Sequence, residues 1–192
     1  MEPLLLVGVP ILIVLIWLIG TWNGLVRLRN HCDESWSGID TELKRRHDLI
    51  PNLVEVVKGY AKHERETFEA VVAARTLAQS EMGTPSQQAD AENGLVRALR
   101  GLFFVSESYP DLKASENFLS LQRQLSNTED RIQSARRFYN ANVRDMNNRV
   151  ESFPSSIVAG MGGFRRREFF EVEDAGVRAV PQVDLGAGDP GA

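Results

Sequence analysis

Few residues in this sequence are of the kinds that build disulfides, metal centres or active sites. The chain has 192 residues and one cysteine, Cys32, so an intramolecular disulfide is excluded. None of its three histidines follows a glutamate by three residues, as di-metal helical bundles require, and none completes a His-Glu-x-x-His zinc motif. A Gly-x-Ser-x-Gly nucleophile motif and a phosphate-binding loop are also missing. We therefore expect no catalytic, cofactor-binding or metal-binding residues.

A surplus of positive charge is also missing. The formal net charge is −4 at pH 7, which argues against a nucleic-acid partner. With 43% hydrophobic and 25% charged residues, the chain is neither disordered nor collagen-like. The distribution is uneven, however, because 18 of the first 26 residues are hydrophobic and Glu2 is the only charged residue among them. The sequence thus divides into a short apolar head and a longer body of mixed charge.

The apolar head, residues 1–26, predicts a transmembrane anchor. A bilayer core of roughly 30 Å needs about 20 helical residues, and the uncharged run between Glu2 and Arg27 is long enough. A cleaved signal peptide would have a basic residue before the apolar run and a small-x-small cleavage site after it, and neither is found. We expect an uncleaved anchor, with tryptophans at its exit interface. The membrane contacts we expect are Leu4, Ile11, Trp17, Ile19 and Trp22.

Positive charges flank only one end of this anchor. No Lys or Arg precedes it, whereas Arg27 and Arg29 follow it closely. The positive-inside rule then places the N-terminus outside and the body in the cytoplasm. We therefore expect a single-pass protein of the cytoplasmic membrane.

Apolar residues recur every three or four positions through most of the body, which predicts helices. One such register runs from Leu25 to Ala78 and crosses Pro51 without a slip, so we expect one long kinked helix. Another covers about 115–153 and resembles a heptad seam. Between them, Thr84-Pro85-Ser86-Gln87 predicts a capping box that opens a shorter helix. The predicted fold is all-α, a transmembrane helix that continues into an antiparallel four-helix bundle over 27–163.

The C-terminal part of the sequence has no helical period. Residues 164–183 begin with phenylalanines around the basic run 165–167, and this run suggests either contact with an anionic membrane or docking onto the bundle. Nearby acidic residues offset the three arginines, so docking is favoured. Residues 184–192 are rich in glycine and have no apolar period, which is typical of a disordered tail.

Two polar clusters in the body are candidate sites for interaction or structure. The first lies around His47 and is readily interpreted as a solvated helix face. The second comprises Tyr139, Asn140, Asn142, Asn147 and Asn148, where we favour a buried network that fixes helix alignment over a ligand site. A metal-dependent or enzymatic role for His47, Asp48, His63 and Glu64 is the alternative. On an ideal helix the two histidines would lie about 24 Å apart on nearly opposite faces, which opposes it. The candidate residues are Arg45, Arg46, His47, Asp48, Asn52, His63, Glu64, Tyr139 and Asn140.

Several of these motifs together resemble the LemA family of bacterial membrane-anchored proteins. The resemblance is strongest in Leu43-Lys-Arg-Arg-His-Asp-Leu-Ile-Pro-Asn-Leu-Val54 and continues in Arg136-Arg-Phe-Tyr-Asn140 and Phe153-Pro154. It implies a membrane helix followed by a helical bundle, and it implies no enzymatic activity or cofactor. It also implies partners by gene association, namely TPM-domain proteins or membrane proteases.

Together these observations predict a non-enzymatic scaffold or interaction protein of the bacterial envelope. We expect it in the bacterial inner membrane, where the bundle would meet partner proteins or further copies of itself as a homo-oligomer. A self-assembling protein that remodels membranes is a further alternative.

Overall fold

The computed structural model describes residues 2–81 and 83–172, which are helical or extended and contain no β-strand. This confirms the prediction of an all-α fold. The predictions for the later part of the docking segment, residues 173–183, and for the tail, residues 184–192, concern residues outside the described ones. The helices are α1 (Glu2–Tyr60), α2 (Arg65–Ser80), α3 (Pro85–Glu107), α4 (Pro110–Lys113), α5 (Glu116–Glu151) and α6 (Ser155–Met161).

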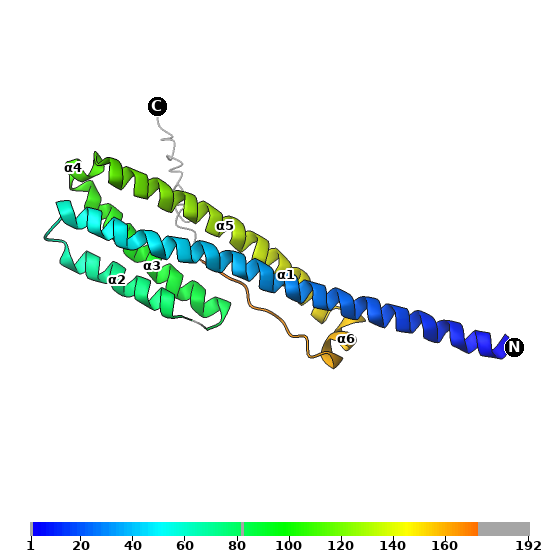
Figure 1. Cartoon of the computed structure of the whole chain (residues 1–192). Helices are drawn as coiled ribbons and strands as arrows, with labels where there is room; N and C mark the ends of the chain where they lie inside the picture. Colours follow the sequence, from blue (N-terminus) through cyan, green and yellow to red (C-terminus); the bar gives the residue numbers. More distant parts are fainter. Residues whose placement is uncertain (1, 82, 173–192) are drawn as a thin grey trace, which may run out of the picture.

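Helix α1 contains both the apolar head and a main part of the body. Its 59 residues correspond to a length of roughly 90 Å. The first part projects beyond the other helices, as Figure 1 shows, and its apolar side chains from Val7 to Ile16 are exposed. In the described residues, α1 is the one helix long and apolar enough to cross a membrane. Pro51 lies inside α1, so the prediction of a helix that continues through this proline is confirmed.

The prediction that this helix extends to Ala78 is wrong. Helix α1 ends at Tyr60, the chain turns over residues 61–64, and α2 runs back along α1 (Figure 1). The apolar period survives the turn because Ala61, Phe68 and Ala78 all face the same core. Gly59 in the last turn of α1 was the local sign of a helix end, since glycine is frequent there.

Helices α1 and α5 run antiparallel along most of the molecule (Figure 1). Both helices contribute side chains to two hydrophobic cores. The core far from the N-terminus, here the distal core, combines α1 from Ile50 to Val57 and Ala61 just after it with α2, α3, α4 and the first turns of α5 up to Leu125. The proximal core combines α1 from Leu25 to Leu43 with α5 from Ile132 onward, α6, the extended residues 164–172 and Ala89 of α3. The extended segment thus takes the place beside α1 and α5 that α2 and α3 occupy in the distal half.

The predictions for the start of α3 and for the extent of α5 are confirmed, but the prediction for Phe153 is wrong. The capping box is confirmed, because the Gln87 amide donates to Thr84 Oγ1 at 3.4 Å and the Thr84 amide donates to Gln87 Oε1 at 2.8 Å. The helix expected over 115–153 is confirmed as α5. Phe153, however, was expected on its buried seam and is 82% exposed, because α5 ends at Glu151 and the chain turns away.

Candidate functional site

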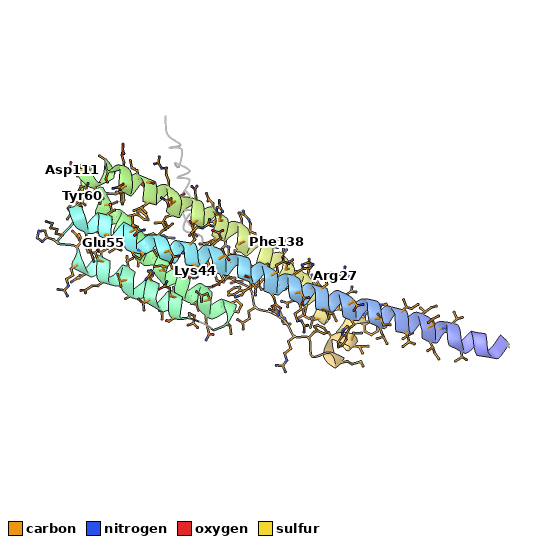
Figure 2. The ribbon with its side chains drawn as sticks, in the orientation of Figure 1. Arg27, Lys44, Glu55, Tyr60, Asp111 and Phe138 are labelled. Carbon is orange, nitrogen blue, oxygen red and sulfur yellow. The ribbon has the colours of Figure 1, made fainter. Side chains whose placement is uncertain are left out.

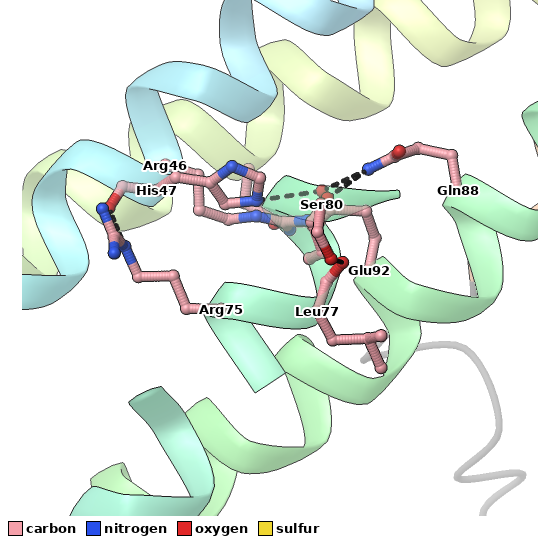
Figure 3. A network of polar contacts seen from close by, with 9 residues as sticks. Arg46, His47, Arg75, Leu77, Ser80, Gln88 and Glu92 are labelled. Carbon is pink, nitrogen blue, oxygen red and sulfur yellow. Dashed lines mark hydrogen bonds and ion pairs between the residues drawn. The ribbon is translucent and has the colours of Figure 1, made fainter. Parts of the chain in front are cut away.

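Three buried side chains, Arg46, His47 and Glu92, form a polar cluster where α1, α3 and α5 meet, and the partly exposed Glu129 completes it (Figure 3). Arg46 of α1 donates from Nη2 to the Glu92 carboxylate of α3, and from Nη1 to Glu129 Oε2 of α5 at 2.8 Å. The side chains of Arg46 and Glu92 are 1% and 0% exposed. His47 Nε2 lies 3.0 Å from the other carboxylate oxygen of Glu92. One guanidinium therefore joins three helices.

Further hydrogen bonds connect this cluster to α2. Gln88 donates from Nε2 to Glu92 Oε1 and to the carbonyl oxygen of Ala78, both at 3.0 Å. Arg75 Nε donates to the carbonyl oxygen of His47 at 2.7 Å (Figure 3). Each of the four long helices thus supplies a residue to one polar network, which we call the Arg46 cluster.

The electrostatics of the Arg46 cluster keep its central carboxylate ionised. Burial alone raises the pKa of Glu92, but the His47 imidazole and the Arg46 guanidinium outweigh it and hold this pKa below its usual value of 4.5. The charge is matched inside the protein, and the carboxylate has no exposed surface. This arrangement suits the fixing of helices in register better than proton transfer to a substrate.

The structure divides the first predicted polar cluster. Arg46 and His47 are buried, so for them the solvated-face interpretation is wrong, whereas Arg45, Asp48 and Asn52 are exposed and lie outside the network. Arg45 pairs instead with Glu42 at 3.3 Å.

Sequence reasoning missed the acidic partners Glu92 and Glu129. An acidic residue on the apolar face of α3, three positions before the buried Leu95, was the signal available for Glu92.

The residues of the metal or enzyme alternative are not brought together. His63 is exposed in the turn after α1, and Glu64 beside it accepts a hydrogen bond from Tyr109 at 3.2 Å. His47 lies 13 residues before the end of α1 at Tyr60, roughly 20 Å along the helix. Among the described residues, no group of three or more His, Cys, Asp or Glu side chains is arranged to hold a metal.

The second predicted cluster holds the extended segment 164–172 against α5. Asn140 Nδ2 donates to the carbonyl oxygen of Phe170 at 3.1 Å, and the amide of Phe170 donates back to Asn140 Oδ1 at 3.0 Å. Asn147 forms the same pair of bonds with Arg167, at 3.0 and 2.8 Å. Asn140 and Asn147 were expected to align helices with one another. They align the extended segment 164–172 with α5 instead.

The spacing of these two asparagines matches the spacing of their backbone partners. Seven residues of helix between Asn140 and Asn147 rise about 10.5 Å. Three extended residues between Arg167 and Phe170 span about 10 Å. The two repeats coincide, so both amides pair with the segment in a single register.

Tyr139 adds a further contact to this segment, because its hydroxyl donates to the carbonyl oxygen of Glu168 at 3.0 Å. Burial raises the pKa of Tyr139 to about 12, so the hydroxyl keeps its proton. The ring of Trp36 packs against Tyr139 and Phe170, with centroids 5.3 and 5.5 Å away. Asn142 is the member of the cluster that does join helices, since its Nδ2 donates to Ser35 Oγ of α1 at 3.2 Å.

We predict that Glu92→Gln destabilises the protein strongly. The amide keeps the shape of the side chain but leaves the buried guanidinium of Arg46 without its main counter-charge, a loss that costs about 3–5 kcal/mol. Chemical denaturation of the full chain in detergent should show the free energy of unfolding falling by that amount. Glu129→Gln is the matched control, and its loss should be smaller because this carboxylate is 33% exposed. Equal losses would contradict the central role of Glu92.

The unchanged protein and Glu92→Gln should also differ in how the free energy of unfolding depends on pH. Because folding lowers the pKa of Glu92, its stabilising effect is present above pH 4.5 and is lost as the pH falls through the folded-state pKa. The native chain should therefore lose stability below pH 4.5 more steeply than Glu92→Gln.

We predict that Asn147→Ala loosens the extended segment. The substitution removes both hydrogen bonds to Arg167, so hydrogen–deuterium exchange of the Arg167 amide should become several-fold faster. Asn148→Ala, at the exposed neighbouring position, should leave the exchange unchanged. Similar exchange in the two variants would show that packing alone holds the segment.

Comparison with known proteins finds relatives that carry the name LemA or the name MamQ. "Protein LemA" of Metamycoplasma hominis is 27% identical over 141 residues, which cover 73% of this chain and 64% of the relative. "Magnetosome protein MamQ 2" of Paramagnetospirillum magneticum is 25% identical over 180 residues, covering 81% and 66%. "Magnetosome protein MamQ" of Magnetospirillum gryphiswaldense is 25% identical over 189 residues, covering 84% and 70%. The chain thus matches about two thirds of the length of these curated relatives.

The match to a family model extends over both polar sites. The model of the LemA family matches residues 35–185, well over half of the sequence. This range contains the Arg46 cluster and both asparagines that hold the extended segment. The chain therefore belongs to the LemA family.

Proposed function

We propose that this protein is a non-enzymatic, single-pass scaffold or interaction protein of the bacterial envelope. It is a membrane-associated helical protein, as its apolar helix and its relatives suggest. Its bundle would meet partner proteins or further copies of itself. The family resemblance makes TPM-domain proteins and membrane proteases the partner classes to test first.

The continuity of α1 is the observation that carries this proposal. One helix contains the exposed apolar run and then forms part of both hydrophobic cores. The bundle is therefore held by the anchor itself, without a flexible linker between them. A body fixed in this way presents the same faces at a constant height above the membrane, which suits a scaffold.

The buried polar groups of the body pair with one another, whereas two phenylalanines face outward. The Arg46 cluster is buried and internally paired, and the names of the relatives denote no enzyme. Phe104 on α3 is 75% exposed and Phe138 on α5 is 62% exposed. Phe138 is labelled in Figure 2. Exposed aromatic residues are enriched in protein interfaces, so these two positions are the first candidates for partner contact.

We predict that a photo-reactive benzoylphenylalanine at Phe138 forms defined covalent adducts in native membranes. The aromatic side chain would lie in the contact, so the full chain should give discrete cross-linked bands, which mass spectrometry identifies. The same probe at Asp130, an exposed polar position on α5, is the matched control and should give few adducts. Adducts of the chain with itself would favour self-assembly, and equally sparse adducts at both positions would contradict a contact at Phe138.

We predict that the N-terminus lies outside and the bundle in the cytoplasm, as Arg27 and Arg29 indicate. With Cys32 replaced by alanine, Glu2→Cys should react with a membrane-impermeant maleimide in intact cells. Lys44→Cys (Figure 2), on the exposed surface of the bundle, should react only after permeabilisation. The opposite pattern would reverse the proposed topology.

A further inference from the structure

Helix α6 lies at the end of the bundle from which α1 projects (Figure 1). This helix and the residue Phe153 before it expose a group of apolar side chains. Phe153, Ile157 and Met161 are 82%, 56% and 79% exposed. The opposite face of α6 is buried, with Val158 and Ala159 in the proximal core. The exposed apolar face, which we call the α6 face, has no partner among the described residues.

The α6 face lies beside the last turns of the predicted membrane span. Trp17 and Thr21 of α1 line one hollow together with Phe153. Trp22 of α1 lines a second hollow together with Met161. Gly162 packs so closely on Trp22 that a Cβ atom there would lie 2.7 Å from the indole ring. These contacts place α6 at the level of residues 17–22.

The length of the apolar run determines where the bilayer ends. A hydrocarbon core of roughly 30 Å needs about 20 helical residues. The uncharged residues between Glu2 and Arg27 are numbered 3–26, so every window of about 20 residues among them includes positions 17 to 22. The membrane boundary therefore lies at or beyond Trp22, and α6 lies within the same depth.

The charges around the α6 face fit a lipid headgroup region. A guanidinium nitrogen of Arg149 lies 3.9 Å from the Cβ position of Gly24, just past Trp22. Arg29 lies over the ring of Phe164, 5.5 Å from its centroid. Arginines above an apolar face, with tryptophans between them, are the usual arrangement at the boundary between acyl chains and anionic headgroups.

We propose that the α6 face is a second membrane contact, which inserts Phe153, Ile157 and Met161 into the boundary between acyl chains and headgroups. This inference rests on the proposed insertion of α1 into the bilayer. Lipid is the occupant because the face continues the lipid-exposed surface of α1 at the same depth. The bundle is then seated on the membrane at two points, and its rotation about α1 is restricted.

Spin labelling of the full chain in liposomes of phosphatidylethanolamine and phosphatidylglycerol tests the α6 face. Nitroxide labels are placed at Ile157→Cys and Met161→Cys, with Cys32 replaced by alanine. We expect the ratio of collisions with oxygen to collisions with an aqueous nickel complex to be several-fold higher at both positions than at Asp130→Cys. Asp130 is the control, because it is exposed and polar and lies far along α5 from α6.

A label at Ile13→Cys in the apolar run separates the two proposals. If this label is immersed and those at 157 and 161 collide freely with the nickel complex, the α6 face does not insert and the anchor stands. If the label at 13 also contacts water, the proposed anchoring by α1 fails, and the α6 contact with it. Low collision rates with both reagents at 157 and 161 would show a protein contact in place of lipid and would overturn the inference.

Discussion

The buried guanidinium of Arg46 constrains how the helices of this protein can pack. A charge removed from water must be paired inside the protein, because its desolvation costs several kcal/mol. Arg46 on α1 meets this requirement through Glu92 on α3 and Glu129 on α5. A slip of either helix by one turn, about 5.4 Å, would break one of these pairs. The cluster therefore sets the heights of the helices, and the apolar residues of the distal core pack around that register.

Different elements cover the apolar faces of α1 and α5 in the distal and proximal halves of the molecule. In the distal half, α2 and α3 cover the apolar faces of α1 and α5, and their backbone groups are paired within each helix. In the proximal half, the extended residues 164–172 provide the cover, and an extended chain has to find partners for its amides and carbonyls elsewhere. Asn140 and Asn147 supply these partners for Phe170 and Arg167, and the Tyr139 hydroxyl supplies one for Glu168. Polar residues on an otherwise helical seam are thus explained by the segment that they bind.

Features with local signals could be predicted from the sequence, and features that depend on distant partners could not. The apolar run, the capping box at Thr84 and the long helix α5 each depend on residues close together in the chain. The turn after Tyr60 was missed because two helices that face one core preserve a common apolar period. Arg46 pairs with Glu92 and Glu129, which lie 46 and 83 positions further along the sequence. The apolar face of α3 marks Glu92 as a buried acid, but no local pattern shows that Arg46 is its partner.

The match between the two asparagines and the extended segment has a consequence for how this region can change during evolution. Both amides bind backbone atoms of the segment, so the hydrogen bonds place no demand on the identity of the side chains at the paired positions. They do demand a fixed number of residues between Arg167 and Phe170, because one added residue of about 3.3 Å would leave one asparagine without its partner. Insertions and deletions should therefore be eliminated in this stretch, whereas substitutions are restricted only where the side chain itself is buried, as that of Phe170 is.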